Sequence, residues 1–264
     1  MMTMGLKNNY HTHTFRCNHC EGTEEQMICA AIKAGIKELG FSDHMPWPAY
    51  ENEVQKIRMK PEEIDDYVST LLSLKKKYEG QIAIYIGFEA EYFPKRAQWL
   101  WDIKEQYPID YFILGQHYHE YEARGRYLAY YDDQKNKCKD YYSDCEEALR
   151  SGLFAYFAHP DIFMANSEIT KEEIDTARKL CRLCKELDIP MEYNLAGCKF
   201  KLKTPLCYPR DEFWKIVAEE KVKVIIGGDY HDPHRILDDP FYENAYNFLT
   251  SLGLEILDEI DLKK

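Results

Sequence analysis

Seven of the nine histidines lie where a short β-favouring run of residues ends, or just beyond its end. Six of the seven such runs finish with a histidine, an aspartate or a glutamate. These terminal residues are His11 and His13, Asp43 and His44, Glu89, His117, His159, and Asp229 and His231. A lone histidine is usually structural, but imidazole and carboxylate groups that recur at strand ends suit a site for zinc, manganese or iron.

The spacing within single runs favours the same chemistry. Residues i and i+2 of a strand point to one face. Three pairs have this spacing: His11 and His13, His117 and His119, and Asp229 and His231. A hydrolytic cluster also needs a carboxylate that bridges two ions about 3.5–4 Å apart, and Glu89 at the end of a central run is suited to that position.

The runs alternate with segments whose apolar residues recur at helical spacing. They are the approach to Tyr10–His13, IKELGFSDH, IAIYIGFEAEY, YFILGQHYH, LFAYFAHPD, IPMEYN and VKVIIGGDYH. Helix starts are indicated by Thr23 with Gln26, by Pro61 and by Thr170. Alternation implies parallel strands with right-handed crossovers, and seven units fit an α/β barrel better than a doubly wound sheet, which the spacing alone leaves open.

The domain organisation follows from what interrupts this alternation. No Gly/Ser-rich or Pro-rich linker, repeat or low-complexity tract divides the chain, so we expect a single domain over residues 1–264. Two connections, residues 45–60 and 120–139, are long and follow strand ends. They are expected to act as lids over a substrate, or else to be solvated loops held by tyrosines.

Composition and charge exclude several function classes. Asp and Glu total 46 against 34 for Lys and Arg, and the net charge of −12 opposes binding of long nucleic acid. No apolar run approaches the roughly 20 residues that span a bilayer, and residues 1–10 lack the apolar core of a secretion signal. We therefore expect a cytoplasmic protein without a membrane partner.

The nine cysteines are an odd number, which favours free thiols over a disulfide framework. Cys181 and Cys184 lie in a segment with helical apolar spacing, so we expect them to pack in a helix, with zinc as the weaker alternative. Cys17 and Cys20 lie among histidines. A metal role is easier to imagine there, but His19 between them is the better-placed ligand.

One set of motifs is specific to a family. The pattern H-x-H-x5-H at residues 11–19 is followed by SDH at 42–44, GFE at 87–89, a histidine after the fourth run, AHPD at 158–161 and GDYH at 228–231. In order and spacing, over almost the whole chain, these motifs resemble the PHP superfamily of phosphoesterases. The resemblance implies a distorted seven-stranded (β/α) barrel, similar to a TIM barrel, with up to three divalent transition-metal ions (Zn, Mn or Fe) at its C-terminal face.

The resemblance also implies which residues hold each ion. One ion would be held by His11, His13, Glu89 and Asp229, a second by Glu89, His117 and His159, and a third by His19, His44 and His231. Three divalent ions carry six positive charges and the two carboxylates carry two negative charges, which leaves a net charge of about +4. Such a charge attracts a phosphate monoester dianion.

Within the superfamily, the chain is most similar to the histidinol-phosphate phosphatase branch. GFEAEYFP, MEYN-x-x-G at residues 191–197 and the YP pair at 208–209 carry this likeness. It implies an enzyme of histidine biosynthesis in which a metal-bound hydroxide hydrolyses L-histidinol phosphate to L-histidinol and phosphate. The alternatives are a PHP nucleotide phosphoesterase or nuclease, and a metal-binding protein without catalysis.

The other candidate site residues are inferred from their positions near the predicted ligands and from their charge. Asp161 or Asp43 is expected to protonate the leaving alkoxide, with a role behind the metal ligands as the alternative. Lys199, where this branch often has arginine, is expected to contact phosphate. Glu91 would bind a cationic group, or else lie at a solvated strand end, and His119 would line the pocket. Trp47, Tyr92 or Tyr118 would pack against a substrate ring, and His234 would lie at the surface.

Overall fold

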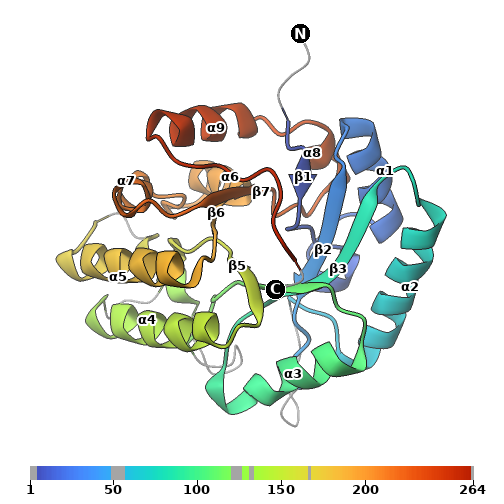
Figure 1. Cartoon of the computed structure of the whole chain (residues 1–264), viewed down its shortest axis with the longest axis horizontal. Helices are drawn as coiled ribbons and strands as arrows, with labels where there is room; N and C mark the ends of the chain where they lie inside the picture. Colours follow the sequence, from blue (N-terminus) through green and yellow to red (C-terminus); the bar gives the residue numbers. More distant parts are fainter. Residues whose placement is uncertain (1–4, 49–56, 120–126, 131–133, 166–167, 263–264) are drawn as a thin grey trace.

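Seven parallel strands form one sheet in the order of the sequence. The computed structural model describes residues 5–48, 57–119, 127–130, 134–165 and 168–262. The strands are β1 (Asn8–Asn9), β2 (Glu38–His44), β3 (Ala83–Ala90), β4 (Tyr111–Leu114), β5 (Phe154–Phe157), β6 (Met191–Asn194) and β7 (Val224–Gly227). Figure 1 shows them inside a layer of helices. This is the predicted distorted, TIM-like (β/α)7 barrel.

The sheet nearly closes through the residues that follow β1 and β7. Thr12 and Tyr230 form a parallel bridge. The His13 amide donates a hydrogen bond to the Tyr230 carbonyl at 2.9 Å, and the Tyr230 amide donates to the His11 carbonyl at 3.2 Å. The first and last units of the chain therefore meet at the C-terminal ends of the strands.

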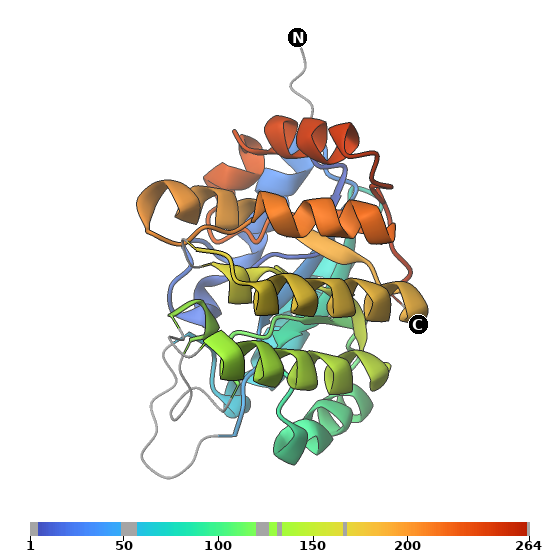
Figure 2. The ribbon, with the colours of Figure 1, turned by 90° about the vertical axis from the view of Figure 1, so that its left-hand side faces the viewer.

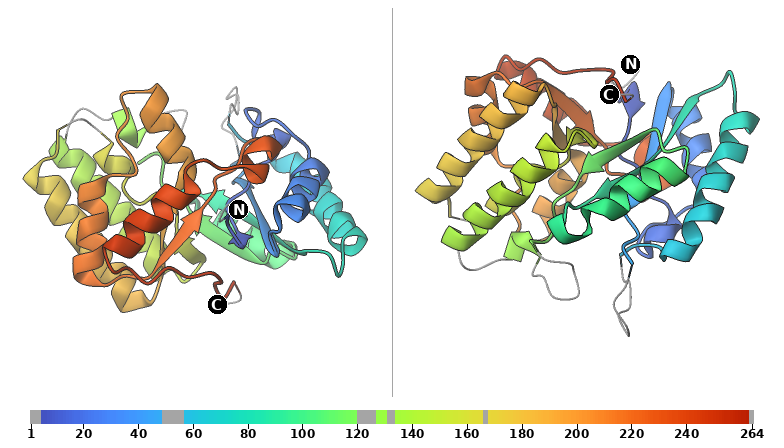
Figure 3. Two further views of the ribbon diagram at one scale, coloured as in Figure 1. Left: turned by 90° about the horizontal axis from the view of Figure 1, so that it is seen from above. Right: turned by 60° about the horizontal axis from the view of Figure 1, so that its bottom comes forward.

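Helices cover the outside of the sheet, as two further directions also show (Figure 3). They are α1 (Glu24–Ala34), α2 (Ile64–Lys77), α3 (Ala97–Gln106), α4 (Gln134–Arg150), α5 (Lys171–Leu187), α6 (Leu195–Lys203), α7 (Asp211–Glu220), α8 (Pro233–Leu237) and α9 (Tyr242–Ser251). Figure 2 shows α4, α5 and α7 as neighbouring, nearly parallel rows. Consecutive units therefore lie side by side, in agreement with the strand order of the sheet.

The predicted helix starts are confirmed. Thr23 and Gln26 form a capping box at α1, and Thr170 and Glu173 form one at α5. Pro61 opens a short 3-10 turn, η2 (Pro61–Glu63), that leads directly into α2. The capping side chains satisfy amide groups that would otherwise lack a partner at each helix start.

Apolar side chains fill two layers, one on each face of the strands. Phe112 and Leu114 of β4 belong to the large cluster between sheet and helices, whereas Tyr111 and Ile113 belong to a smaller cluster on the other face. The smaller cluster includes Leu262 near the end of the chain. Because alternate residues of a strand point to opposite faces, the smaller cluster is the packed interior of the barrel, which forms the floor beneath the strand ends.

Both long connections lie partly outside the described residues, and so do the lids predicted there. Residues 49–56, 120–126 and 131–133 are among those that the structure does not describe. The second predicted loop, residues 120–139, is too long, because α4 begins at Gln134. The polar segment DQKNK gives little helical signal, but Lys137 pairs with Glu173 of α5 at 3.0 Å and Cys138 is buried, so tertiary contacts favour the helix.

The cysteines are free thiols, as expected. Cys181 and Cys184 are fully buried in α5, which confirms that they pack in a helix. Among the described residues, no helix has both the length and the apolar character needed to cross a membrane.

Gly87 in β3 is required by the close approach of β4. A Cβ at this position would lie 2.5 Å from the backbone oxygen of Tyr111, which cannot move without disturbing the strand pairing. We predict that Gly87→Ala lowers the free energy of unfolding by about 1–3 kcal/mol, measured by urea denaturation. Gly5→Ala is the control, since nothing lies within 4 Å of its Cβ position. Equal stability of the two variants would contradict this account of the strand contact.

Candidate metal centre

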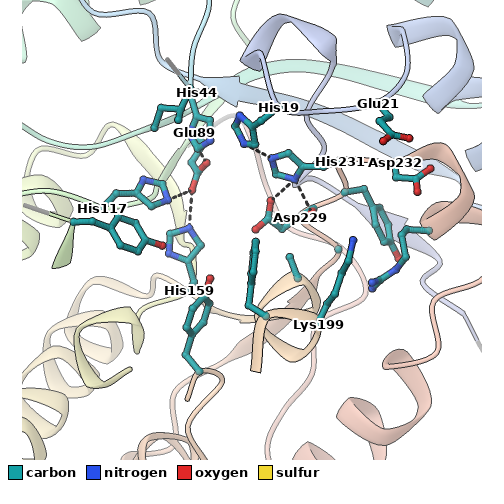
Figure 4. Close-up of a pocket in the computed structure, with 18 of the residues that line it drawn as sticks. His19, Glu21, His44, Glu89, His117, His159, Lys199, Asp229, His231 and Asp232 are labelled. Atoms are coloured by element: carbon teal, nitrogen blue, oxygen red, sulfur yellow. Dashed lines mark hydrogen bonds and ion pairs between the residues drawn. The ribbon is translucent and has the colours of Figure 1, made fainter. Parts of the chain in front are cut away.

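A pocket of about 480 Å³ lies at the C-terminal ends of the strands. Figure 4 shows histidines and carboxylates from distant parts of the chain converging on it. Seven of the nine predicted metal ligands line the pocket directly, and His11 and His13 lie buried behind Glu89 and Asp229. The predicted ligands therefore come together in space, because the near-closed barrel brings all strand ends to one face.

His11, His13, Glu89 and Asp229 form the deepest group. The Nε2 atoms of His11 and His13 lie 3.6 and 3.4 Å from Glu89 Oε2, and 3.5 and 3.3 Å from Asp229 Oδ1. His11 Nε2, both ring nitrogens of His13 and Asp229 Oδ1 are buried without a hydrogen-bond partner in the described part of the chain. Lone pairs that converge in this way fit a cation, because buried polar atoms are otherwise paired.

Glu89 divides its two oxygens between two groups of histidines. Its Oε1 lies 2.7 Å from His159 Nε2 and 3.4 Å from His117 Nε2, whereas its Oε2 faces His11, His13 and, at 3.0 Å, His44 Nδ1. Burial alone would raise the pKa of Glu89, but the surrounding histidines hold it well below its usual value. The carboxylate is therefore ionised and has the geometry of a bridge between two cations.

The third group contains His19, His44 and His231. Nδ1 of His19 donates to the Cys17 carbonyl at 2.7 Å and Nδ1 of His231 donates to the Asp229 carbonyl at 3.1 Å, so both Nε2 atoms carry lone pairs. These two Nε2 atoms are 2.9 Å apart. A cation between the rings would remove the repulsion of their lone pairs.

Burial keeps His44 in the neutral form that binds metals. It lowers the pKa of His44 to about 3, although Glu89 opposes this shift. Cys17 also lies beside this group, with its ligand atom within 4.8 Å of those of His13 and His231. Seven imidazoles with two carboxylates form a donor set that suits zinc, manganese or iron.

Two of the ligand residues have left-handed backbone conformations. The φ angles of His159 and Asp229, which follow the ends of β5 and β7, are 31° and 46°. Such conformations cost of order 1–3 kcal/mol in residues other than glycine and cluster at functional sites. They also turn the chain away from the strand direction, so the i, i+2 rule no longer applies beyond these residues.

Glu91 does not face the pocket, and its predicted contact with a cationic substrate group is therefore revised. Its side chain is 1% exposed. Both oxygens lie 3.2 Å from Arg58 nitrogens, and Oε1 lies 3.2 Å from His117 Nδ1. Burial opposes ionisation, but Arg58 and His117 lower the pKa of Glu91 below its usual value. Glu91 thus holds His117 from behind, because the chain turns after β3 ends at Ala90.

Two of the three aromatic residues predicted to contact a substrate ring also lie elsewhere. Trp47 is fully buried and its Nε1 donates to Glu91 Oε2 at 3.3 Å. Tyr92 is buried and does not line the pocket. Tyr118 lines the pocket and remains a candidate.

Asp161 and Asp43 lie behind the ligands, which agrees with the alternative role predicted for them and not with contact with the leaving group. Asp161 accepts hydrogen bonds from the Arg210 amide at 2.6 Å and from Trp214 Nε1 at 3.1 Å. The turn at His159 directs it there. Asp43 accepts from the amide and hydroxyl of Thr14, at 2.9 and 2.7 Å. Burial raises the pKa of Asp161 to about 6 and that of Asp43 to about 7.

His119 and Lys199 have different outcomes. The His119 ring bonds through Nδ1 to Asp144 of α4 at 2.7 Å and does not line the pocket, so its predicted position is wrong. Lys199 on α6 lines the pocket, and its contact with phosphate stays a prediction. His234 lies on α8, outside the pocket.

Several residues that line the pocket were not predicted from the sequence. They are Glu21, Tyr127, Tyr208, Asp232 and Arg235. Glu21 is two residues after the predicted ligand His19, and Asp232 directly follows the predicted ligand His231. This proximity in the sequence is the signal that could have identified them. Tyr208 belongs to the YP pair and Tyr127 to the predicted lid, but neither was assigned to the pocket, and Arg235 lies in no motif.

Comparisons with known proteins agree with the resemblance in the sequence. The model of the family described as PHP domain matches residues 9–196. A "Probable histidinol-phosphatase" from Deinococcus radiodurans is 26% identical over 232 residues, which cover 86% of each chain. The histidinol-phosphatase of Bacillus subtilis is 22% identical over 251 residues, 85% of this chain and 93% of that one.

A solved structure has the same fold. It is histidinol phosphate phosphatase from Lactococcus lactis, complexed with zinc, L-histidinol and phosphate. Its TM-score to this chain is 0.73 with 16% sequence identity, and the match covers 97% of this chain and 100% of that one.

The Glu91–Arg58 pair should be important for stability. Both side chains are buried, so removing the Glu91 charge takes a buried ion-pair partner away from Arg58. We predict that Glu91→Gln lowers the free energy of unfolding by about 3–5 kcal/mol, measured by urea denaturation. Glu186→Gln, which breaks the exposed pair with Arg150, should leave the free energy of unfolding nearly unchanged, because exposed ion pairs contribute little. A loss no larger for Glu91→Gln than for this control would show that Glu91 is not needed to balance Arg58.

Proposed function

The chain belongs to the PHP domain family, and on that basis we propose that it is a metal-dependent phosphatase that hydrolyses L-histidinol phosphate to L-histidinol and phosphate. The observation that carries this proposal is the position of Glu89. Its two oxygens face separate groups of histidines at the base of an open pocket. A donor set of this kind supports hydrolysis of a phosphate ester more directly than a scaffold role.

We propose that the centre holds three divalent ions, of zinc, manganese or iron. The three groups described above supply the ligands: His11, His13, Glu89 and Asp229; Glu89, His117 and His159; and His19, His44 and His231. Bound there, divalent ions lower the pKa of water to about 7 and neutralise phosphoryl oxygens.

The pocket residues supply the contacts that orient the phosphate. Lys199 and Arg235 are the cationic side chains that line the pocket within the described residues. Both can balance charge on phosphoryl oxygens, Lys199 as a point charge and Arg235 as a planar donor. Burial raises the pKa values of Tyr127 and Tyr208, so their hydroxyl groups remain protonated at neutral pH and can donate to an ester oxygen.

The acidic residues at the rim suit the other end of the substrate. Glu21 and Asp232 line the pocket near His231 (Figure 4) and are not among the proposed ligands. The amine of L-histidinol phosphate is a cation, and its imidazole can pack against Tyr118. The net charge of −12 further favours a small phosphate monoester over long nucleic acid.

We predict that the purified protein binds close to three transition-metal ions per chain, measured by elemental analysis after growth in metal-replete medium. Glu89→Gln should reduce metal content and activity more than His19→Ala, because a neutral amide bridges two cations poorly and His19 belongs to one group only. A reproducible content of one ion or less, together with a His19→Ala variant of unchanged content and activity, would refute the three-ion centre.

We predict that kcat/KM for L-histidinol phosphate exceeds that for nucleoside monophosphates and aryl phosphates by at least roughly tenfold, or about 1.4 kcal/mol in transition-state binding. Glu21→Gln and Asp232→Asn should reduce this preference while largely sparing an aryl phosphate without an amine. The second substitution preserves the start of α8, because an asparagine side chain can accept the His234 amide proton as Asp232 does at 2.8 Å.

The control for this experiment is Glu62→Gln, which removes an exposed acid outside the pocket and should leave both substrates unchanged. Equal or faster hydrolysis of a nucleotide would instead favour a nucleotide phosphoesterase with the same metal centre. Parallel loss of all substrates in the Glu21 and Asp232 variants would show that these acids act on the centre itself.

A further inference from the structure

Glu192 is a buried carboxylate beside the metal centre, and it is not one of the proposed metal ligands. It lies on β6, and the run that forms β6 is the one that does not end in a histidine or an acid. Its side chain is completely buried. Oε1 lies 2.8 Å from His11 Nδ1, and Oε2 accepts from the His159 amide at 3.2 Å and from Asn194 Nδ2 at 3.0 Å.

The contact with His11 determines which nitrogen of that ring faces the centre. Glu192 accepts hydrogen bonds at its other oxygen from the His159 amide and from Asn194, and its Oε1 is in the position to accept from His11, which places the proton of the His11 ring on Nδ1. Nε2 then carries the lone pair and points toward Glu89 and Asp229, at 3.6 and 3.5 Å. Metal-binding histidines commonly have a carboxylate behind them in this arrangement, which also makes the ring a better donor.

The contacts of Oε2 reach the two strained ligand residues. The His159 amide belongs to the residue with a φ of 31°. Asn194 Nδ2, besides bonding Glu192, lies 3.2 Å from Oδ2 of Asp229, whose φ is 46°. One carboxylate thus links the residues that follow β1, β5 and β7.

The neighbouring strand leaves room for this carboxylate. A Cβ on Gly227 of β7 would overlap Glu192 Oε1. Gly227 is paired with Asn194 in the sheet and does not have a positive φ, so the close approach of Glu192 is what requires a glycine there. The position of the Glu192 carboxylate therefore depends on both β6 and β7.

We propose that Glu192 is a positioning residue for the metal centre: its carboxylate fixes the Nδ1–H form of His11 and holds the backbone of His159 and the side chain of Asp229 for binding. The proposal rests on the proposed metal centre but not on the identity of the substrate. A glutamine cannot replace Glu192, because both oxygens accept from donors, and an amide nitrogen would face a donor in either orientation.

The test measures zinc binding and not turnover. Competition with a chromophoric chelator should show Glu192→Gln binding zinc at least tenfold more weakly than the wild type. Gly227→Ala should weaken binding in the same direction, because it displaces the carboxylate without removing its charge. In the zinc-loaded wild type, selective ¹⁵N labelling should show a strongly deshielded Nδ1 proton on His11, and Glu192→Gln should lose that shift.

Glu173→Gln is the matched control. Glu173 is equally buried but pairs with Lys137 between α4 and α5, away from the site. This variant should lose stability and keep zinc affinity within about twofold of the wild type, which separates general destabilisation from positioning. Unchanged zinc affinity and an unchanged His11 proton shift in Glu192→Gln would overturn the proposal. An absence of phosphatase activity with these zinc results intact would count against the proposed substrate alone.

Discussion

The pairing of the residues after β1 with those after β7 is the constraint on which the site depends. Two backbone hydrogen bonds join His11 and His13 to Tyr230. They place two histidines from the start of the chain beside Asp229 and His231 from near its end. Without this closure the deepest group of ligands would be divided between the two edges of an open sheet.

The closure also creates an electrostatic problem, because it buries several carboxylates and imidazoles together. Elsewhere in the interior, carboxylates are balanced by permanent cations: Glu91 by Arg58, and Glu173 by Lys137. Glu89 and Asp229 are instead surrounded by histidines, and Glu192 faces the His11 ring. Neutral imidazoles cannot compensate buried carboxylates, so the arrangement requires protons or metal ions, which is the physical reason for assigning a metal centre to it.

Support for the ligands extends over much of the molecule. The His117 ring is held by a hydrogen bond to Glu91, and Glu91 in turn forms an ion pair with Arg58. His19 and His231 are oriented by backbone carbonyls, and His11 by Glu192. In each of these four rings one nitrogen forms a hydrogen bond away from the centre, so the other nitrogen faces the centre. The precision of the site therefore comes partly from carbonyl groups two residues away and partly from carboxylates that are distant in sequence.

The sequence alone determined the alternation of strands and helices, the helix starts, and the acids and histidines that gather at the strand ends. These are consequences of local residue spacing and of a topology in which all parallel strands end on one face. Only the tertiary structure decided what lies beyond each strand end. Glu91, Asp161 and His119 were predicted to face the pocket because they stand two residues from a ligand, but the chain turns there and their partners are Arg58, Trp214 and Asp144. Glu192 lies in the MEYN motif, but its role could not be predicted from the sequence. That role depends on Gly227 and His11, because distant partners set the direction of a side chain in a packed interior.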